Sequence, residues 1–287
     1  GEVLIYQGLD PGTDFTLVGR YRIGSPVGRR CLLKSGADLA VITLDGIVGL
    51  SEVITLDRAA SNKVAISDRI RRAFNSAALL HKSKFGWQMV SYPLGSQGAM
   101  IFVNVPITEN SEQHQYVMNA QTGAWCRFKG WNANAWTVFN DKIYFGGGGG
   151  KTYLADTGLS DAGSTKIRGV IQTSFAYPND LADYKQFKTV RAIVFTEIGA
   201  AFGLILITDF NNEYNLDFVG FDPGTSGSVW DVATWDIDPW ATVGVSNDFH
   251  DNPATGACVS AVFFTETISF EIKLNAIDIL WEKGNIQ

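Results

Sequence analysis

Short runs of apolar and aromatic residues recur along this chain, and turn residues separate them. Val3–Gln7 and Phe15–Ile23 are the first two runs, with Asp10-Pro11-Gly12 between them. The next two runs enclose the dipeptide Asp45-Gly46, which is typical of a tight hairpin turn. Short strands with regularly spaced turn signals predict an all-β protein.

One segment departs from the strand pattern and predicts a single short helix over residues 67–81. Ser67-Asp68 offers an N-cap, and four apolar residues follow at helical spacing. These are Ile70, Phe74, Ala77 and Leu80. Arg69, Arg71 and Arg72 fall mostly on the other side of that helix. They indicate either a contact with a partner or DNA, or a solvated helix face.

The spacing of the strands before residue 158 is typical of β-propeller blades. Four short strands fit between Trp125 and Asp156, close to the length of one four-stranded blade. Residues 1–158 have room for three or four blades at that period, whereas a closed propeller normally needs at least four. We therefore expect a small or partial propeller-like domain over residues 1–158.

The strands lengthen after Gly163, which predicts a second domain of β-sandwich type over residues 164–287. The small polar stretch Thr157–Ser164 has linker composition. A long acidic insertion with three tryptophans occupies Asn211–Thr255. The strands expected around it are Lys166–Ser174, Phe187–Thr196, Leu204–Asp209, Val259–Thr265, Thr267–Leu274 and Ala276–Trp281.

Composition supports a globular protein with a large core. Of the 287 residues, 46% are hydrophobic and only 18% are charged, and the formal net charge is −6. An acidic chain without a basic stripe is not expected to grip DNA, although it is compatible with a channel through which DNA slides. The sequence holds no apolar run long enough to span a membrane. The start lacks an initiator Met and falls within a strand pattern, so we expect a piece of a longer protein.

The run GGGGGKT at Gly146–Thr152 superficially resembles a phosphate-binding loop. That loop requires a glycine where this chain has Phe145, and a helix behind it. A strand pattern follows Thr152 instead, so the segment predicts a β-hairpin with a glycine-rich tip. Gly147 and Gly148, at that tip, are candidate contacts with a neighbouring subunit.

No residue pattern points to catalysis, to a metal or to a cofactor. The alternating polar residues of Asp209–Asp217 suggest a calcium loop, but Tyr214 and Gly220 stand where its glycine and glutamate belong. A less regular cation site in that segment stays open. Trp235 and Trp240 lie among acidic residues and could stack on sugar rings, or belong to a core or interface. The three histidines lack metal-ligand spacing.

Several stretches, in order, resemble the β-propeller-containing tail structural proteins of short-tailed bacteriophages, the packaged-DNA stabilisation or tail nozzle and hub group. The resemblance covers most of the length. It is carried by Gly1–Tyr6 (GEVLIY), Leu17–Arg30 (LVGRYRIGSPVGRR), Ala37–Leu50 (ADLAVITLDGIVGL), Phe85–Pro106, Gln121–Phe128 (QTGAWCRF), Val138–Asp156, Lys188–Val194 (KTVRAIV) and Asn275–Gly284 (NAIDILWEKG). The glycine run and the Asn211–Thr255 insertion depart from the family's pattern.

This resemblance implies a non-enzymatic part of the virion, assembled in the host cytoplasm. Such proteins form homo-oligomeric rings, typically sixfold, and contact other tail and head–tail connector proteins. They retain packaged DNA and line its exit path without sequence-specific binding. The alternative from the residues is a carbohydrate-binding or glycan-degrading propeller module of a tailspike-like protein, resting on Trp230, Trp235 and Trp240.

Overall fold

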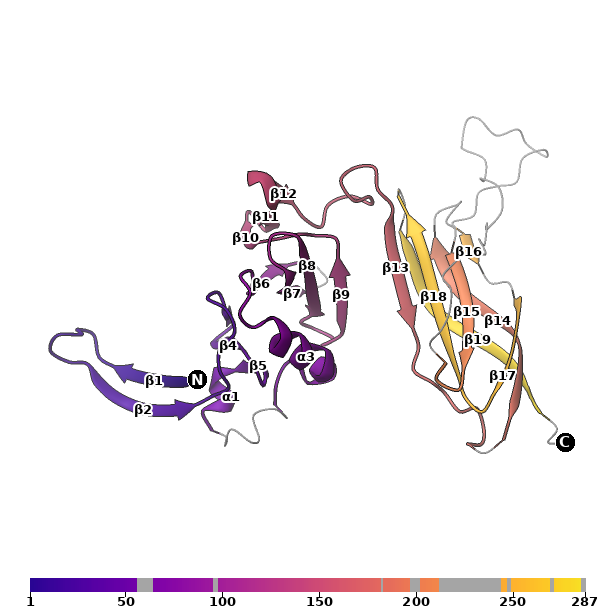
Figure 1. Cartoon of the computed structure of the whole chain (residues 1–287), viewed down its shortest axis with the longest axis horizontal. Coiled ribbons are helices and arrows are strands. Elements are labelled where there is room, and N and C mark those ends of the chain that lie inside the picture. The colour runs from indigo at the N-terminus through magenta and orange to yellow at the C-terminus, as the bar shows by residue number, and fades with distance from the viewer. Residues whose placement is uncertain are drawn as a thin grey trace. The chain divides into compact units, whose positions relative to one another are not determined.

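The computed structural model of the chain is mostly β, in several small antiparallel sheets, which confirms the expected fold class at that level (Figure 1). The chain divides into two compact units, Gly1–Thr157 and Gly158–Gln287. Each unit is described by itself. The structure describes residues 1–55, 64–94, 98–181, 183–196, 202–211, 244–246, 249–268 and 271–284.

The first unit begins with a two-stranded antiparallel hairpin, β1 (Glu2–Gln7) and β2 (Thr16–Arg22), called the arm below. Figure 1 shows it extending from the body of its unit. The loop at its tip is tied by the Asp10 carboxylate, which accepts the Gly12 N–H at 2.8 Å. At the base, the N-terminal ammonium donates to the Ile23 carbonyl at 2.9 Å.

Three antiparallel meanders follow the arm, and in each the strands pair in chain order. Their strands are β3 (Leu32–Ser35), β4 (Asp38–Thr43), β5 (Gly46–Gly49); β6 (Gln88–Pro93), β7 (Ala99–Thr108), β8 (Glu112–Asn119), β9 (Trp125–Lys129); and β10 (Ala135–Phe139), β11 (Lys142–Gly146), β12 (Thr152–Leu154). The prediction that Trp125–Asp156 forms one four-stranded blade is wrong. β9 pairs with β8, so the four-stranded sheet is β6–β9, and the chain turns away into a new sheet after Gly130.

The predicted helix exists, but its start differs from the expectation. α3 (Arg71–His81) follows a 3-10 turn, η1 (Asp68–Ile70). The Ser67 side chain does not cap this helix; its Oγ accepts the Ile47 N–H at 3.0 Å and so fastens the segment to β5. Phe74 and Ala77 are buried as expected, whereas Leu80 is 69% exposed. A short helix α1 (Leu50–Val53), which the sequence pattern did not indicate, directly follows β5.

The central sheet β6–β9 carries the core of the first unit because both of its faces are covered. Successive residues of β7 alternate between faces, as a strand requires. Ile101 and Val103 join the core that contains Phe74 of α3. Phe102 points the other way, into an aromatic cluster with Trp136 and with the sheet β10–β12. Burial on both faces explains why β7 is an almost unbroken apolar run.

Three buried polar side chains, Asn104, Gln113 and Gln115, interrupt that apolar strand pair. The Asn104 amide donates to the carbonyls of Gly86 and Ala133, at 2.8 and 3.0 Å, and to Gln113 Oε1 at 3.1 Å. Gln115 Nε2 donates in turn to Asn104 Oδ1 at 2.8 Å. Gly86 precedes β6 and Ala133 precedes β10, so the network fixes the connections that lead into two sheets.

The second unit has two sheets whose apolar side chains pack together in two clusters. Phe187, Leu206, Val259 and Ile277 pack together although they come from both sheets. In one sheet β18 lies between β13 and β15; in the other β14 pairs with β16 and β17 on one side and β19 on the other. The strands are β13 (Ile167–Gln172), β14 (Lys185–Thr196), β15 (Phe202–Thr208), β16 (Gly244–Ser246), β17 (His250–Gly256), β18 (Val259–Thr267) and β19 (Ile272–Lys283).

Two expectations for this unit are wrong. The expected break between Leu274 and Ala276 does not exist: both residues lie on β19, because a bulge against β14 absorbs Asn275 and pairing continues past it. The predicted insertion Asn211–Thr255 also contains regular structure, because β16 and most of β17 lie within it. Pro253 concealed β17; the strand tolerates this proline beside a bulge in its pairing with β14.

We expect Asn104→Ala to destabilise the first unit by about 2–3 kcal/mol, because it leaves several buried carbonyl and amide groups without partners. Peptide-resolved hydrogen exchange measures this change, because it reports the stability of each unit independently. The control is Lys34→Ala on the exposed side of β3, for which the expected change is within about 0.5 kcal/mol. Similar protection in both variants would contradict a structural role for the network.

Candidate interaction surfaces

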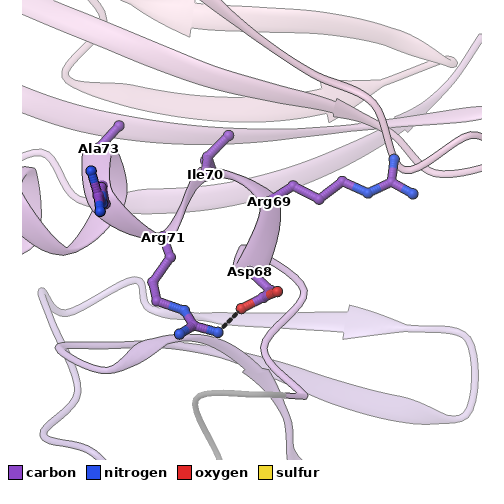
Figure 2. A pocket seen from close by; sticks show the side chains of 6 residues that line it. Asp68, Arg69, Ile70, Arg71 and Ala73 are labelled. Carbon is purple, nitrogen blue, oxygen red and sulfur yellow. Dashed lines mark hydrogen bonds and ion pairs between the residues drawn. The ribbon is translucent and has the colours of Figure 1, made fainter. Parts of the chain in front are cut away.

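A shallow depression lies beside the start of α3, where the sequence places three arginines (Figure 2). One continuous segment lines it: Asp68, Arg69, Ile70, Arg71, Arg72 and Ala73. A small-molecule site normally draws a few polar groups from several elements into one concavity. A wall built from a single segment does not provide that convergence, so this depression gives no support for a small-molecule site.

The arginines of this segment differ in what they contact. Arg69 Nη1 donates to the carbonyls of Thr122 and Gly123, at 3.2 and 3.0 Å, in the turn between β8 and β9. Arg71 forms an ion pair with Asp68, and in Figure 2 Arg69 points away from that pair. Arg72 is exposed on α3. Arg69 is therefore a tie between the helix segment and a hairpin turn, a role that its position in the sequence did not indicate.

The glycine-rich segment is a hairpin, as predicted. β11 and β12 pair antiparallel, and the Gly147 N–H donates to the Lys151 carbonyl at 2.9 Å across the tip. Gly149 has φ near 72°, which favours glycine strongly. A Cβ on Gly147 would lie 2.8 Å from the Tyr153 ring, whereas one on Gly148 would meet open space. Gly148 is thus exposed and free to contact another molecule, and Gly147 packs within its own hairpin.

Other predicted candidates fall wholly or partly outside the described residues. Trp235 and Trp240 do so entirely, and so does most of the Asp209–Asp217 segment. Asp209 itself is described: its carboxylate accepts the backbone N–H groups of Ala257 and Cys258, at 2.8 and 3.3 Å. That carboxylate therefore joins the end of β15 to the start of β18. In the described part of the chain, no three His, Cys, Asp or Glu side chains form a group able to hold a metal ion.

The arm is the most apolar exposed element of the first unit, and sequence reasoning missed its significance. Leu4, Tyr6, Phe15 and Leu17 are each 45–52% exposed. The rings of Tyr6 and Phe15 stack with centroids 5.1 Å apart. The continuous apolar run Val3–Tyr6 is typical of a strand covered on both faces. That run was the signal in the sequence for the apolar surface that the arm exposes.

The two units also differ in charge, which the whole-chain value of −6 conceals. Residues 1–157 contain 16 basic and 12 acidic residues, a net charge of +4. Residues 158–287 contain 7 basic and 17 acidic residues, a net charge of −10. Each unit therefore attracts molecules of opposite net charge.

The fold lowers the pKa of two histidines of the first unit. Burial lowers the pKa of His81, and the nearby charges of Lys84 and His114 lower it further. Burial also lowers the pKa of His114; its hydrogen bond to Glu112, at 3.0 Å, opposes that shift, while Lys129 adds to it. His81 ends α3 and His114 lies on β8, and the two are close enough for their charges to interact.

No family model matches this chain, and no curated protein is similar enough to count as a relative. Among the described residues, no helix combines the length and the apolar character needed to cross a lipid bilayer.

We expect Gly149→Ala to destabilise the first unit by about 1 kcal/mol, because alanine strains at the left-handed φ of that position. Gly148→Ala is the matched control one residue away: it has ordinary φ and open space, so its expected effect is within about 0.5 kcal/mol of zero. Urea denaturation of both variants measures the difference. Equal stability would mean that the tip relaxes freely around either alanine.

The two histidines predict a loss of stability in mild acid. Because each pKa is lower in the folded state, the unfolded chain binds more protons as the pH falls below about 6.5. The melting temperature of the first unit should therefore fall between pH 7.5 and pH 5.5. His114→Gln should flatten that dependence in calorimetric scans across this range. An unchanged slope in the variant would exclude His114 as a contributor.

Proposed function

We propose that this chain is a non-enzymatic structural subunit of a bacteriophage tail. In this proposal it forms a homo-oligomeric ring, of six copies by the family resemblance, and belongs to the nozzle or hub of the virion. Other tail and head–tail connector proteins are its partners, and DNA passes through the ring without sequence-specific binding.

The observation that carries the proposal is how the three meanders of the first unit contact one another. Their first strands, β3, β6 and β10, are neighbours in sequence order. Arg30, before β3, bridges to Gln88 of β6, and the Gln88 side chain exchanges two hydrogen bonds with the Trp136 backbone of β10, at 2.7 and 2.9 Å. Propeller blades meet in this way around an axis, each by its first strand.

The cores between the meanders also support a proposal of stacked blades. One core lies between β3–β5 and β6–β9, and a second lies between β6–β9 and β10–β12. Three blades are too few to close a circle. We therefore infer a propeller-like arc for the first unit, and a sandwich-like arrangement for the two sheets of the second unit, whose apolar side chains pack together in two clusters.

The surfaces that this chain exposes suit a subunit that joins others in an assembly. Its first unit exposes the apolar arm, and its two units have opposite net charges. A ring forms when one surface of a subunit binds a different surface of the next and the rotation closes. The overall charge of −6 agrees with a conduit that does not hold its DNA.

The test is the state of assembly of the purified chain at micromolar concentration. We expect ring-shaped homo-oligomers by mass photometry and negative-stain electron microscopy. Mobility-shift assays should show only weak, salt-sensitive association with duplex DNA and no preference among DNA sequences. A chain that stays monomeric at every concentration, alone and with the connector and tail proteins of the same virion, would refute the proposal.

A further inference from the structure

We propose that the apolar face of the arm docks on the outer face of the sheet β10–β12 of a second copy of this chain. The inference rests on the proposed function, since it names the contact by which subunits join. It follows from two exposed apolar surfaces at opposite ends of the first unit and from the charges beside them.

The apolar side chains of the arm share one of its faces with the ion pair of Glu2 and Arg20. Tyr6 pairs directly with Leu17 across the hairpin, so their side chains share a face, and Phe15 stacks on Tyr6. Leu4 lies two residues before Tyr6 and therefore points the same way. A two-stranded hairpin is marginally stable in water by itself. An arm with about half of each of these side chains exposed gains most from being covered.

The receiving surface is the outer face of β10–β12. In this sheet Trp136, Ile143 and Phe145 point into the unit's core, so the alternate residues point outward. Thr137 pairs with Tyr144, and Tyr144 pairs with Leu154, which places these three side chains on one outer face. The apolar members of that face include Phe139, 64% exposed, and Leu154, 40% exposed.

The acidic tip of the arm and the lysines of the receiving sheet are opposite in charge, while Arg20 on the arm and Asp141 beside Lys142 are also exposed. The tip of the arm carries Asp10 and Asp14, both exposed. The hydrogen bonds of Asp10 with the Gly12 N–H and with Thr13 lower the pKa of its carboxyl, so it stays ionised at neutral pH. The receiving sheet carries Lys142, paired with Phe139, and Lys151 at the glycine-rich tip, both exposed. Opposite charges beside matching apolar surfaces fix the partner and its register.

The positions of the two surfaces require two copies. Val3 of the arm packs with Ile23, Val41 and Val48 on the face of β3–β5 that is turned away from β6–β9. The receiving face lies on the far side of β10–β12, at the other end of the stack (Figure 1). A contact between unlike ends is head to tail, and it generates a ring if the rotation closes.

Charge reversal across the contact tests this inference in the full chain. The arm-tip variant carries Asp10→Asn and Asp14→Lys. The amide oxygen of the asparagine at position 10 still accepts the Gly12 N–H. Lys142→Glu with Lys151→Glu alters the receiving sheet. We expect each pair to weaken self-association at least tenfold in sedimentation velocity at low salt. The fourfold variant, which restores opposite charges, should recover most of the loss. The matched control, Lys34→Glu with Lys129→Glu on other strands, should leave association unchanged.

Each outcome separates this inference from the proposed function. Wild-type rings with undiminished association in both charge variants would overturn the arm contact and leave the tail function standing. The arm contact is also overturned if both double variants lose self-association and the fourfold variant does not recover it, provided that circular dichroism shows every variant folded. A wild-type chain that never assembles, alone or with the connector and tail proteins of its virion, would refute the proposed function itself.

Discussion

The first unit depends on the amide of Asn104, a polar side chain placed in the middle of a buried apolar strand. A sheet covered on both faces gains most from apolar residues, so Asn104 has a cost that its hydrogen bonds must offset. It offsets that cost by holding the carbonyls of Gly86 and Ala133, which precede the first strands of two sheets. Apolar packing alone would let adjacent sheets slide, because it has no direction. The network sets where each sheet begins.

Gly86 shows how closely that network is fitted. Its φ of 122° suits glycine, and a Cβ there would lie 3.0 Å from Gln113 Oε1. The backbone must come this close for its carbonyl to reach Asn104. One side chain and one glycine, 18 residues apart, therefore act together in placing β6.

Local signals in the sequence predicted the parts of the fold that depend on neighbouring residues. The hairpin at Asp45-Gly46 and the glycine-rich tip are of this kind, since a tight turn and the strands beside it are sufficient. The predictions failed where a residue far away in the sequence determines the local structure. Ser67 bonds Ile47 instead of capping its helix, and β9 joins β8 instead of β10. The bulge at Asn275 keeps β19 whole only because β14 runs beside it.

The candidate surfaces divide in the same way. Gly148 was predicted from its position at an exposed tip, and the structure leaves it exposed. Arg69 was predicted to face solvent or a partner, but its guanidinium reaches a turn more than 50 residues away in the chain. The apolar face of the arm was not predicted, because the exposure of Leu4 and Tyr6 depends on what the rest of the unit does not cover.

The pairing of β14 with β19 has a mechanical consequence. The two strands are hydrogen-bonded along their length, from Lys185 with Lys283 to Thr196 with Ile272. A pull along β19 would load many of these bonds at once, in shear, whereas the short hairpin of the arm would open one bond at a time. Tension applied through β19 is therefore resisted far more strongly than tension applied across the β1–β2 hairpin.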